Sequence, residues 1–127
     1  MNLPAKKITS FIDLDAWKVG HEIVLAIYRI TRQYPREEMY GLISQMRRCA
    51  VSITSNIAEG FTRQSYREKI QFYSIAHGSI TELQNQLIIS KDLNLITTTE
   101  YTNLFELTIR IHKIVTGLIK SSRNRIS

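Results

Sequence analysis

The chain has 127 residues, a length that predicts a single domain. Hydrophobic residues make up 43% and charged residues 22%, as in ordinary folded proteins, and only five Gly and two Pro argue against a turn-rich all-β fold. The formal net charge of +6 suits an acidic partner such as nucleic acid, and the single cysteine, Cys49, excludes an internal disulfide framework.

The start of the chain carries Lys6 and Lys7 but lacks the apolar stretch of a secretion signal. No apolar run approaches the ~18 residues that a membrane span needs. Together with the lone cysteine, these features predict a cytoplasmic protein that has no membrane partner.

The first predicted helix follows a polar, aperiodic tail at residues 1–10. It runs from about Leu14 to Gln33, with Ser10 or Asp13 as its cap. Two apolar stripes on one helix predict contacts with more than one neighbour. The stripes are Leu14, Trp17, His21, Val24 and Tyr28, and Ala16, Gly20, Ile23, Ile27 and Ile30.

The second predicted helix starts at Pro35 and ends near Ala58, where Gly60 is expected to terminate it in a left-handed conformation. Its apolar seam consists of Met39, Ile43, Met46, Ala50, Ile53 and Ile57. A polar stripe runs beside the seam through Gln45, Arg48, Ser52, Ser55 and Glu59. Because small residues interrupt the polar stripe, we expect it to be partly buried, inside the protein or at a subunit contact.

The third predicted helix is capped by Ser65, with Glu68 as capping-box partner, and runs to about Lys91. Gly78 inside it is expected to permit a close helix crossing. Thr98 or Thr99 is expected to cap a fourth helix over about 100–121, whose core face is Leu104, Leu107, Ile111, Ile114 and Leu118.

Four helices joined by short links predict an all-α fold, an up-down-up-down antiparallel four-helix bundle. The bundle domain is assigned to residues 11–122. Residues 123–127 form a short basic tail.

The sequence offers no constellation for catalysis. His21, His77 and His112 fall on different predicted helices, and no Glu-x-x-His pair of the kind used by di-iron bundles is present. Cys49 and the nearby serines have no histidine at helical spacing, so nucleophilic catalysis is unsupported. We therefore expect no enzyme activity, no metal site and no cofactor.

Several short motifs around the second helix occur together and in order. They are Gly41-Leu42, Ser44-Gln45, Arg47-Arg48, Val51-Ser52-Ile53 and Ser55-Asn56-Ile57-Ala58-Glu59-Gly60-Phe61. With these motifs the sequence resembles the bacterial 23S ribosomal RNA intervening-sequence proteins, also called four-helix bundle proteins. The resemblance covers roughly residues 11–95, and Cys49 and His77 depart from the usual family residues. The resemblance implies a homo-oligomer, most simply a closed ring of five copies. Some relatives bind nucleic acid, so the resemblance also implies a nucleic-acid partner.

Two groups of residues are singled out as candidate sites. The candidate nucleic-acid contacts are Arg47, Arg63, Arg67 and Lys69, which flank the signature helix. The expected structural polar network is Gln45, Arg48, Ser52, Asn56, Glu59 and Glu82. In this network Arg48 is expected to pair with Glu59, Glu82 or both, because a lone buried charge is costly. For each basic residue, a simple solvated charge remains an equally good interpretation.

Two hypotheses follow. The first is a non-enzymatic homo-oligomer that associates with RNA or another nucleic acid through a basic surface. The second is a scaffold that binds another protein and has no direct nucleic-acid role.

Overall fold

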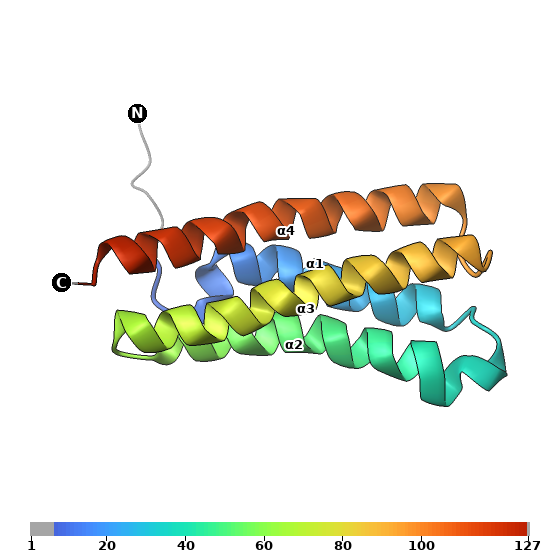
Figure 1. Cartoon of the computed structure of the whole chain (residues 1–127), viewed down its shortest axis with the longest axis horizontal. Helices are drawn as coiled ribbons and strands as arrows, with labels where there is room; N and C mark the ends of the chain where they lie inside the picture. Colours follow the sequence, from blue (N-terminus) through green and yellow to red (C-terminus); the bar gives the residue numbers. More distant parts are fainter. Residues whose placement is uncertain (1–6, 127) are drawn as a thin grey trace.

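The computed structural model describes residues 7–126, which form four long helices and contain no strand. The helices are α1 (Asp15–Thr31), α2 (Ser44–Thr62), α3 (Tyr66–Asp92) and α4 (Thr98–Asn124). In Figure 1 successive helices run in opposite directions, consistent with the predicted up-down-up-down arrangement. Each helix packs against the next one, and α4 also packs against α1, so the four helices enclose one core. Residues 1–6 of the predicted N-terminal tail lie outside the described residues.

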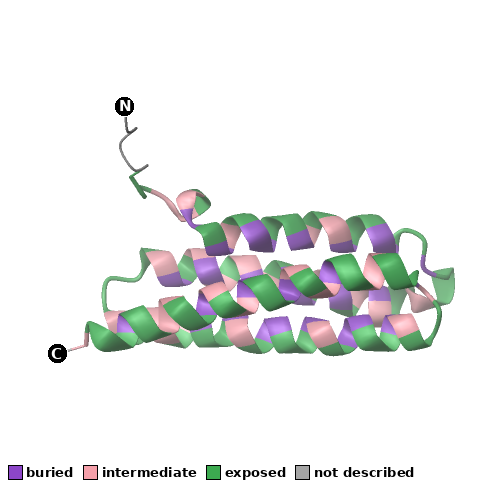
Figure 2. Ribbon diagram, turned by 90° about the horizontal axis from the view of Figure 1, so that it is seen from above, coloured by how far each residue is buried: buried purple, intermediate pink, exposed green. Residues whose placement is uncertain are grey.

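The core is built from the stripes that face inward on all four helices (Figure 2). Its largest fully buried apolar side chains are Ile23, Ile27, Met46, Ile53, Ile57, Ile80, Leu83, Leu87, Ile111 and Val115. Of the two stripes predicted on α1, the one through Ile23 and Ile27 is buried. In the other stripe Leu14 is buried and Trp17 and Val24 pack against the core, whereas His21 and Tyr28 are exposed. Tyr28 is thus the apolar residue of this stripe that the core leaves uncovered.

The starts of α3 and α4 are fixed by side-chain caps. The Ser65 hydroxyl accepts a hydrogen bond from the Glu68 amide at 3.1 Å, as the sequence predicted. The cap of α4 is Thr97 and not the predicted Thr98 or Thr99. The Thr97 hydroxyl accepts a hydrogen bond from the Glu100 amide, and the Glu100 carboxylate accepts one from the Thr97 amide at 2.9 Å. The preceding turn contains Asn94 with φ of 59°, a left-handed conformation that asparagine tolerates.

The second helix differs most from its prediction. Between Pro35 and Ser44 the chain forms a 3-10 turn (Arg36–Glu38) and a wide turn (Met39–Ile43), with Gly41 at φ −111° and ψ −109°. Met39 is therefore 45% exposed and does not belong to the core seam. The regular helix begins only at Ser44.

Gly60 does not end α2 in a left-handed conformation, because no glycine among residues 7–126 has a positive φ. It lies inside the helix and is buried. A Cβ atom there would lie 2.6 Å from the Tyr73 ring, so Gly60 allows α2 and α3 to approach closely. The helix continues to Thr62.

Gly78 was expected to permit a close crossing, and this prediction is wrong, because a Cβ atom at Gly78 would meet nothing within 4 Å. The same holds for Gly117 on α4. Replacing either glycine by alanine should raise the free energy of unfolding by about 1 kcal/mol, because alanine loses less backbone entropy in a helix. Thermal unfolding of Gly78→Ala and Gly117→Ala chains measures this, and a lower melting temperature for both would contradict it.

Candidate functional site

Three of the four predicted nucleic-acid contacts lie where α2 passes to α3, and two of them, Arg63 and Lys69, have partners within the chain. The Arg63 guanidinium pairs with the Glu59 carboxylate at 3.0 Å and lies 4.6 Å from the centre of the Phe72 ring. The Lys69 ammonium donates to the carbonyl oxygens of Gly60 at 3.2 Å and Phe61 at 2.7 Å, and burial lowers its pKa. Lys69 thus caps the carbonyl end of α2.

Arg47 lies toward the other end of the bundle. It precedes Arg63 by sixteen residues of α2, which span about 24 Å. Its Nε donates to the Thr31 hydroxyl at 2.9 Å, and its guanidinium lies 4.7 Å from the centre of the Tyr28 ring. Arg67 is exposed and has no hydrogen bond or ion pair with any other described residue. The four predicted residues therefore do not make one patch, and Arg67 alone among them leaves its charge unpaired.

The predicted polar network exists in part, between α2 and α3. The Ser52 and Ser79 hydroxyls lie 3.0 Å apart, and the Asn56 amide donates to the Ser52 carbonyl at 2.8 Å and to its hydroxyl at 3.1 Å. Nearby, the Cys49 thiol donates to the Ser79 carbonyl at 3.0 Å. Burial raises the pKa of Cys49 to about 12, and the Glu82 carboxylate adds to the shift. The thiol is therefore protonated and unreactive at neutral pH.

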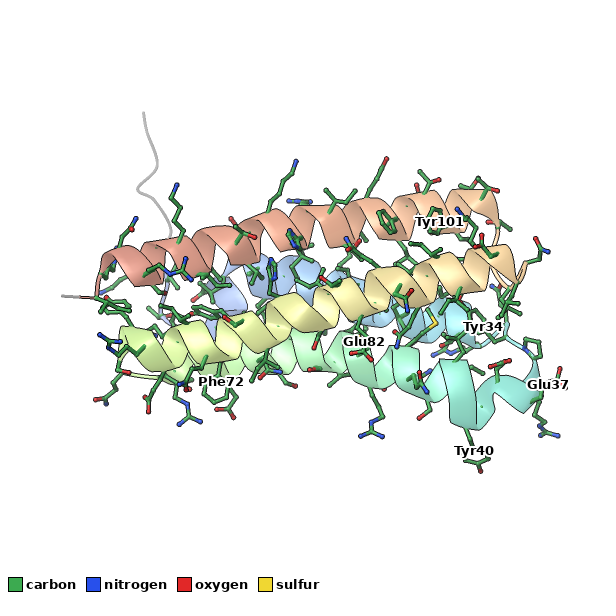
Figure 3. All side chains as sticks on the ribbon, in the orientation of Figure 1. Tyr34, Glu37, Tyr40, Phe72, Glu82 and Tyr101 are labelled. Carbon is green, nitrogen blue, oxygen red and sulfur yellow. The ribbon has the colours of Figure 1, made fainter. Side chains whose placement is uncertain are left out.

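Gln45, Arg48 and Glu82 line an open cavity of about 310 Å³ over this network. Figure 3 shows Glu82 between α2 and α3. All three residues are exposed, as are Ser55 and Glu59, so within a single chain the predicted partial burial of the polar stripe holds only at Ser52.

The predicted ion pair between Arg48 and Glu59 is wrong. Eleven residues of helix separate them by about 16 Å, and Glu59 pairs with Arg63 one turn away. Within the described residues Arg48 has no ion pair with Glu82 either. Because Arg48 and Glu82 are exposed, water satisfies both charges and the cost that motivated the prediction does not arise.

This geometry predicts that Arg47 contributes more to the stability of the fold than its neighbour Arg48. Arg47→Met removes a hydrogen bond and a ring contact of a half-buried guanidinium, so it should cost about 1–2 kcal/mol of unfolding free energy. Arg48→Met should change it by less than ~0.5 kcal/mol, because the side chain is exposed. Thermal unfolding of the two variants compares them directly, and a larger loss for Arg48→Met would contradict the assignment.

A group of unpaired basic residues lies on the outer side of α4. We call it the α4 basic face and define it as Arg110, Lys113, Lys120 and Arg123. All four residues are exposed, and none of them has a hydrogen bond or ion pair in the described part of the chain. The sequence holds no Asp or Glu after Glu106, and this acid-free stretch is the signal that the sequence analysis missed.

The end of α4 lies against the start of α3. The Arg125 guanidinium donates to the Tyr66 hydroxyl at 3.2 Å, and Tyr66 precedes the unpaired Arg67. Arg67 thus lies at the end of the bundle where α3 begins and α4 ends, and its exposed side chain leaves α3 about 100° round the helix from Tyr66.

The structure also brings together His77 and His112, which the sequence placed on separate helices. Their ring centres are 4.0 Å apart, and His77 Nε2 lies 3.2 Å from the Thr116 hydroxyl. Burial, and then the neighbouring His112, lower the pKa of His77. No group of three or more His, Cys, Asp and Glu side chains in residues 7–126 is placed to hold a metal ion.

Exposed apolar side chains gather at the wide turn before α2. Tyr40 is 96% exposed and points away from the bundle in Figure 3, and Met39 is 45% exposed. Tyr28 of α1, with Arg47 and Arg48 of α2, joins them around a cavity of about 330 Å³. No helix in the described part of the chain is long and apolar enough to cross a bilayer.

Comparison with known proteins identifies relatives. The sequence profile described as 23S rRNA-intervening sequence protein matches residues 12–117. A crystal structure of a protein of unknown function from the S23 ribosomal protein family of Bacteroides thetaiotaomicron has a TM-score of 0.77 and 23% sequence identity. The similarity covers 83% of this chain and 95% of that one, so the two share a fold. No curated protein matches the sequence.

Proposed function

Since the chain belongs to the 23S rRNA-intervening sequence protein family, we propose that it is a non-enzymatic, self-associating protein that binds RNA or another nucleic acid through a basic surface. The observation that carries the proposal is the α4 basic face, where four exposed cations have no intramolecular partner and no acidic residue follows Glu106. Unpaired cations can neutralise phosphates and release counterions, which is the main source of non-specific nucleic-acid affinity.

The binding surface proposed here differs from the residues first singled out. Arg63 and Lys69 already satisfy their charges within the chain, and a phosphate would have to compete with Glu59 or with the carbonyl oxygens of α2. Arg67 keeps its place, because it is exposed and lies beside Tyr66, which contacts the end of α4. We therefore assign the phosphate contacts to the α4 basic face together with Arg67.

Helical spacing supports this assignment. Lys113 and Lys120 are seven residues apart and nearly aligned, and Arg110 and Arg123 lie three residues outside them, so the four charges spread over an arc of about 140° on the exposed side of α4. From Arg110 to Arg123 the helix rises about 20 Å. A row of charges of this length contacts several successive phosphates of one strand.

Binding to a single-stranded RNA is the test. A fluorescent uridine 20-mer titrated with the protein at ~50 mM salt should show saturable binding that weakens steeply as salt rises. Failure of the protein to bind this RNA at ~50 mM salt would overturn the nucleic-acid proposal.

The scaffold alternative is favoured by one observation, the exposed Tyr40 and Met39 beside Tyr28. Large apolar patches on a surface mark protein contacts. A pull-down from lysate, treated with nuclease before elution, separates the two readings. Loss of the captured partners after nuclease treatment supports nucleic-acid binding, whereas retention of a protein partner supports the scaffold.

The same apolar patch supports self-association. Tyr28 of α1 and the turn before α2 expose apolar surface that the core does not need, and a second chain could cover it. The family resemblance suggests a closed ring of five, in which five chains of +6 would carry +30 and repeat the α4 basic face around the ring. Such repetition would turn a modest patch into a continuous positive surface.

Sedimentation equilibrium at micromolar concentration measures the assembly. We expect a mass several times that of the 14.7 kDa chain. The variant Met39→Glu/Tyr40→Glu should shift the mass toward the monomer, because it places two like charges in the proposed contact. The matched control Ile75→Glu changes an exposed apolar residue on α3, outside this patch. A monomeric parent chain, or equal dissociation of both variants, would contradict the assignment.

A further inference from the structure

The His77–His112 pair lies at the seam between α3 and α4, and neither the core nor the proposed phosphate contacts account for it. Both rings are half-buried, and their centres are 4.0 Å apart with the ring planes inclined by 43°. Two imidazolium rings at this distance would repel each other strongly. The two rings are therefore not both charged in the free protein.

The hydrogen bonds at the pair define which nitrogen can take up a proton. The Thr116 hydroxyl donates to the His112 carbonyl at 2.8 Å, so its single proton is committed. It must then accept from His77 Nε2 at 3.2 Å, which assigns the Nε2–H tautomer to the neutral His77. Nδ1 of His77 is consequently the atom that gains a proton.

Basic residues outnumber acidic residues near the pair. On α4, Thr116, Lys120 and Arg123 follow His112 at four, eight and eleven residues and so lie on the same side of the helix. The nearest acidic residue of α3 in sequence, Glu82, lines the cavity on the α2 side, away from α4. The charged residues of the two helices near the seam are Arg67, Glu68, Lys69 and Glu82 on α3 and Glu106, Arg110, Lys113, Lys120 and Arg123 on α4.

A polyanion on this surface would reverse the electrostatic environment of the pair. Phosphates bound by Lys120 and Arg123 would bring negative charge to the side of α4 that carries His112. That charge stabilises an imidazolium, so binding and protonation must favour each other, and by linkage a lower pH must favour binding.

We propose that the His77–His112 pair is a proton-coupled part of the RNA-binding surface, taking up a proton when the phosphate backbone binds and strengthening binding as pH falls from about 7.5 to 5.5. This inference rests on the proposed function, because it assigns the regulation of the same surface. Burial, and then the neighbouring His112, lower the pKa of His77, so in the free protein this ring gains its proton only at a lower pH than an ordinary histidine.

The experiment measures the affinity for a uridine 20-mer at about pH 7.5 and about pH 5.5, at constant salt. Uridine is chosen because its base does not titrate in this interval. The parent chain should bind about ten-fold more tightly at the lower pH, the change expected when one proton is taken up on binding over part of this range. The double variant His77→Gln/His112→Gln should lose most of this pH dependence, whereas the control His21→Gln, an exposed histidine stacked on Trp17 of α1, should retain it.

Imidazole proton resonances give a second readout that does not depend on the variants folding. In the parent chain, added RNA should raise the pH at which His77 and His112 titrate and leave His21 unchanged. RNA binding that has the same pH dependence in the parent and the double variant, or RNA that leaves these resonances unmoved, overturns the inference while the proposed function stands. Absence of RNA binding at both pH values overturns both.

Discussion

A Gly60→Val chain should lose about 3 kcal/mol or more of its unfolding free energy and melt roughly 10 °C below the parent. The Cβ atom of any other residue at this position would lie 2.6 Å and 2.8 Å from two ring carbons of Tyr73 and 3.2 Å from Cβ of Phe72. Tyr73 is only 3% exposed, so its ring has no free space into which it can move. The extra carbons must therefore push α2 and α3 apart along their whole contact.

The matched control for this prediction is Gly78→Val on α3. It introduces the same side chain into a helix interior, with the same rotamer cost, at a position where a Cβ atom meets nothing within 4 Å. Differential thermal unfolding of the two variants isolates the steric effect from the helix propensity of valine. Equal shifts in melting temperature would mean that the close approach at Gly60 does not stabilise the bundle.

Removing charge from the α4 basic face should have the largest effect on RNA binding. In the variant Lys113→Gln/Lys120→Gln/Arg123→Gln, three of the proposed phosphate contacts disappear, and the slope of log affinity against log salt should flatten by about 2, at about 0.7 per single-strand contact. When salt rises from 50 to 200 mM, the factor by which affinity falls should thus be about 20 times smaller for the variant than for the parent.

The control removes three charges that already have partners within the chain, Arg47, Arg63 and Lys69, with Arg47 and Arg63 changed to Gln and Lys69 to Met. Because these side chains stabilise the fold, the control is used only after thermal unfolding shows that it is folded at the temperature of the titration. Its salt slope should remain close to that of the parent. A flattened slope in the control with an unchanged slope in the α4 variant would move the binding surface to Arg47, Arg63 and Lys69.

The sequence predicted the parts of the fold that depend on local patterns. The Ser65 cap was correct because a cap depends on residues only three apart, although the return bond of a capping box, from the Ser65 amide to the Glu68 carboxylate, does not form in the described residues. The buried stripe of α1 through Ile23 and Ile27 was correct because a core-facing helix repeats its apolar residues at helical spacing. Helix α2 was predicted to start too early, because Pro35 and the acidic residues after it are typical of a helix start, while the wide turn at Gly41 leaves no comparable signal.

The roles of single residues were harder to predict, since they depend on neighbours from other helices. Gly60 and Gly78 are both helical glycines, and only the position of Tyr73 distinguishes a required glycine from a tolerated one. Lys69 was assigned to a nucleic acid because the carbonyl oxygens that it caps lie on another helix. For the same reason, the sequence did not predict the contact between His77 and His112, which are 35 residues apart in the chain.

Lysine acetylation in the presence and absence of RNA, read out by mass spectrometry, tests the central claim most directly. Bound uridine RNA should protect Lys113 and Lys120 of the α4 basic face from modification. It should leave Lys18 on α1 and Lys91 near the other end of α3 as reactive as in the free protein. Protection confined to lysines outside α4, or RNA binding with no change at Lys113 and Lys120, would contradict the assignment of this face as the nucleic-acid surface.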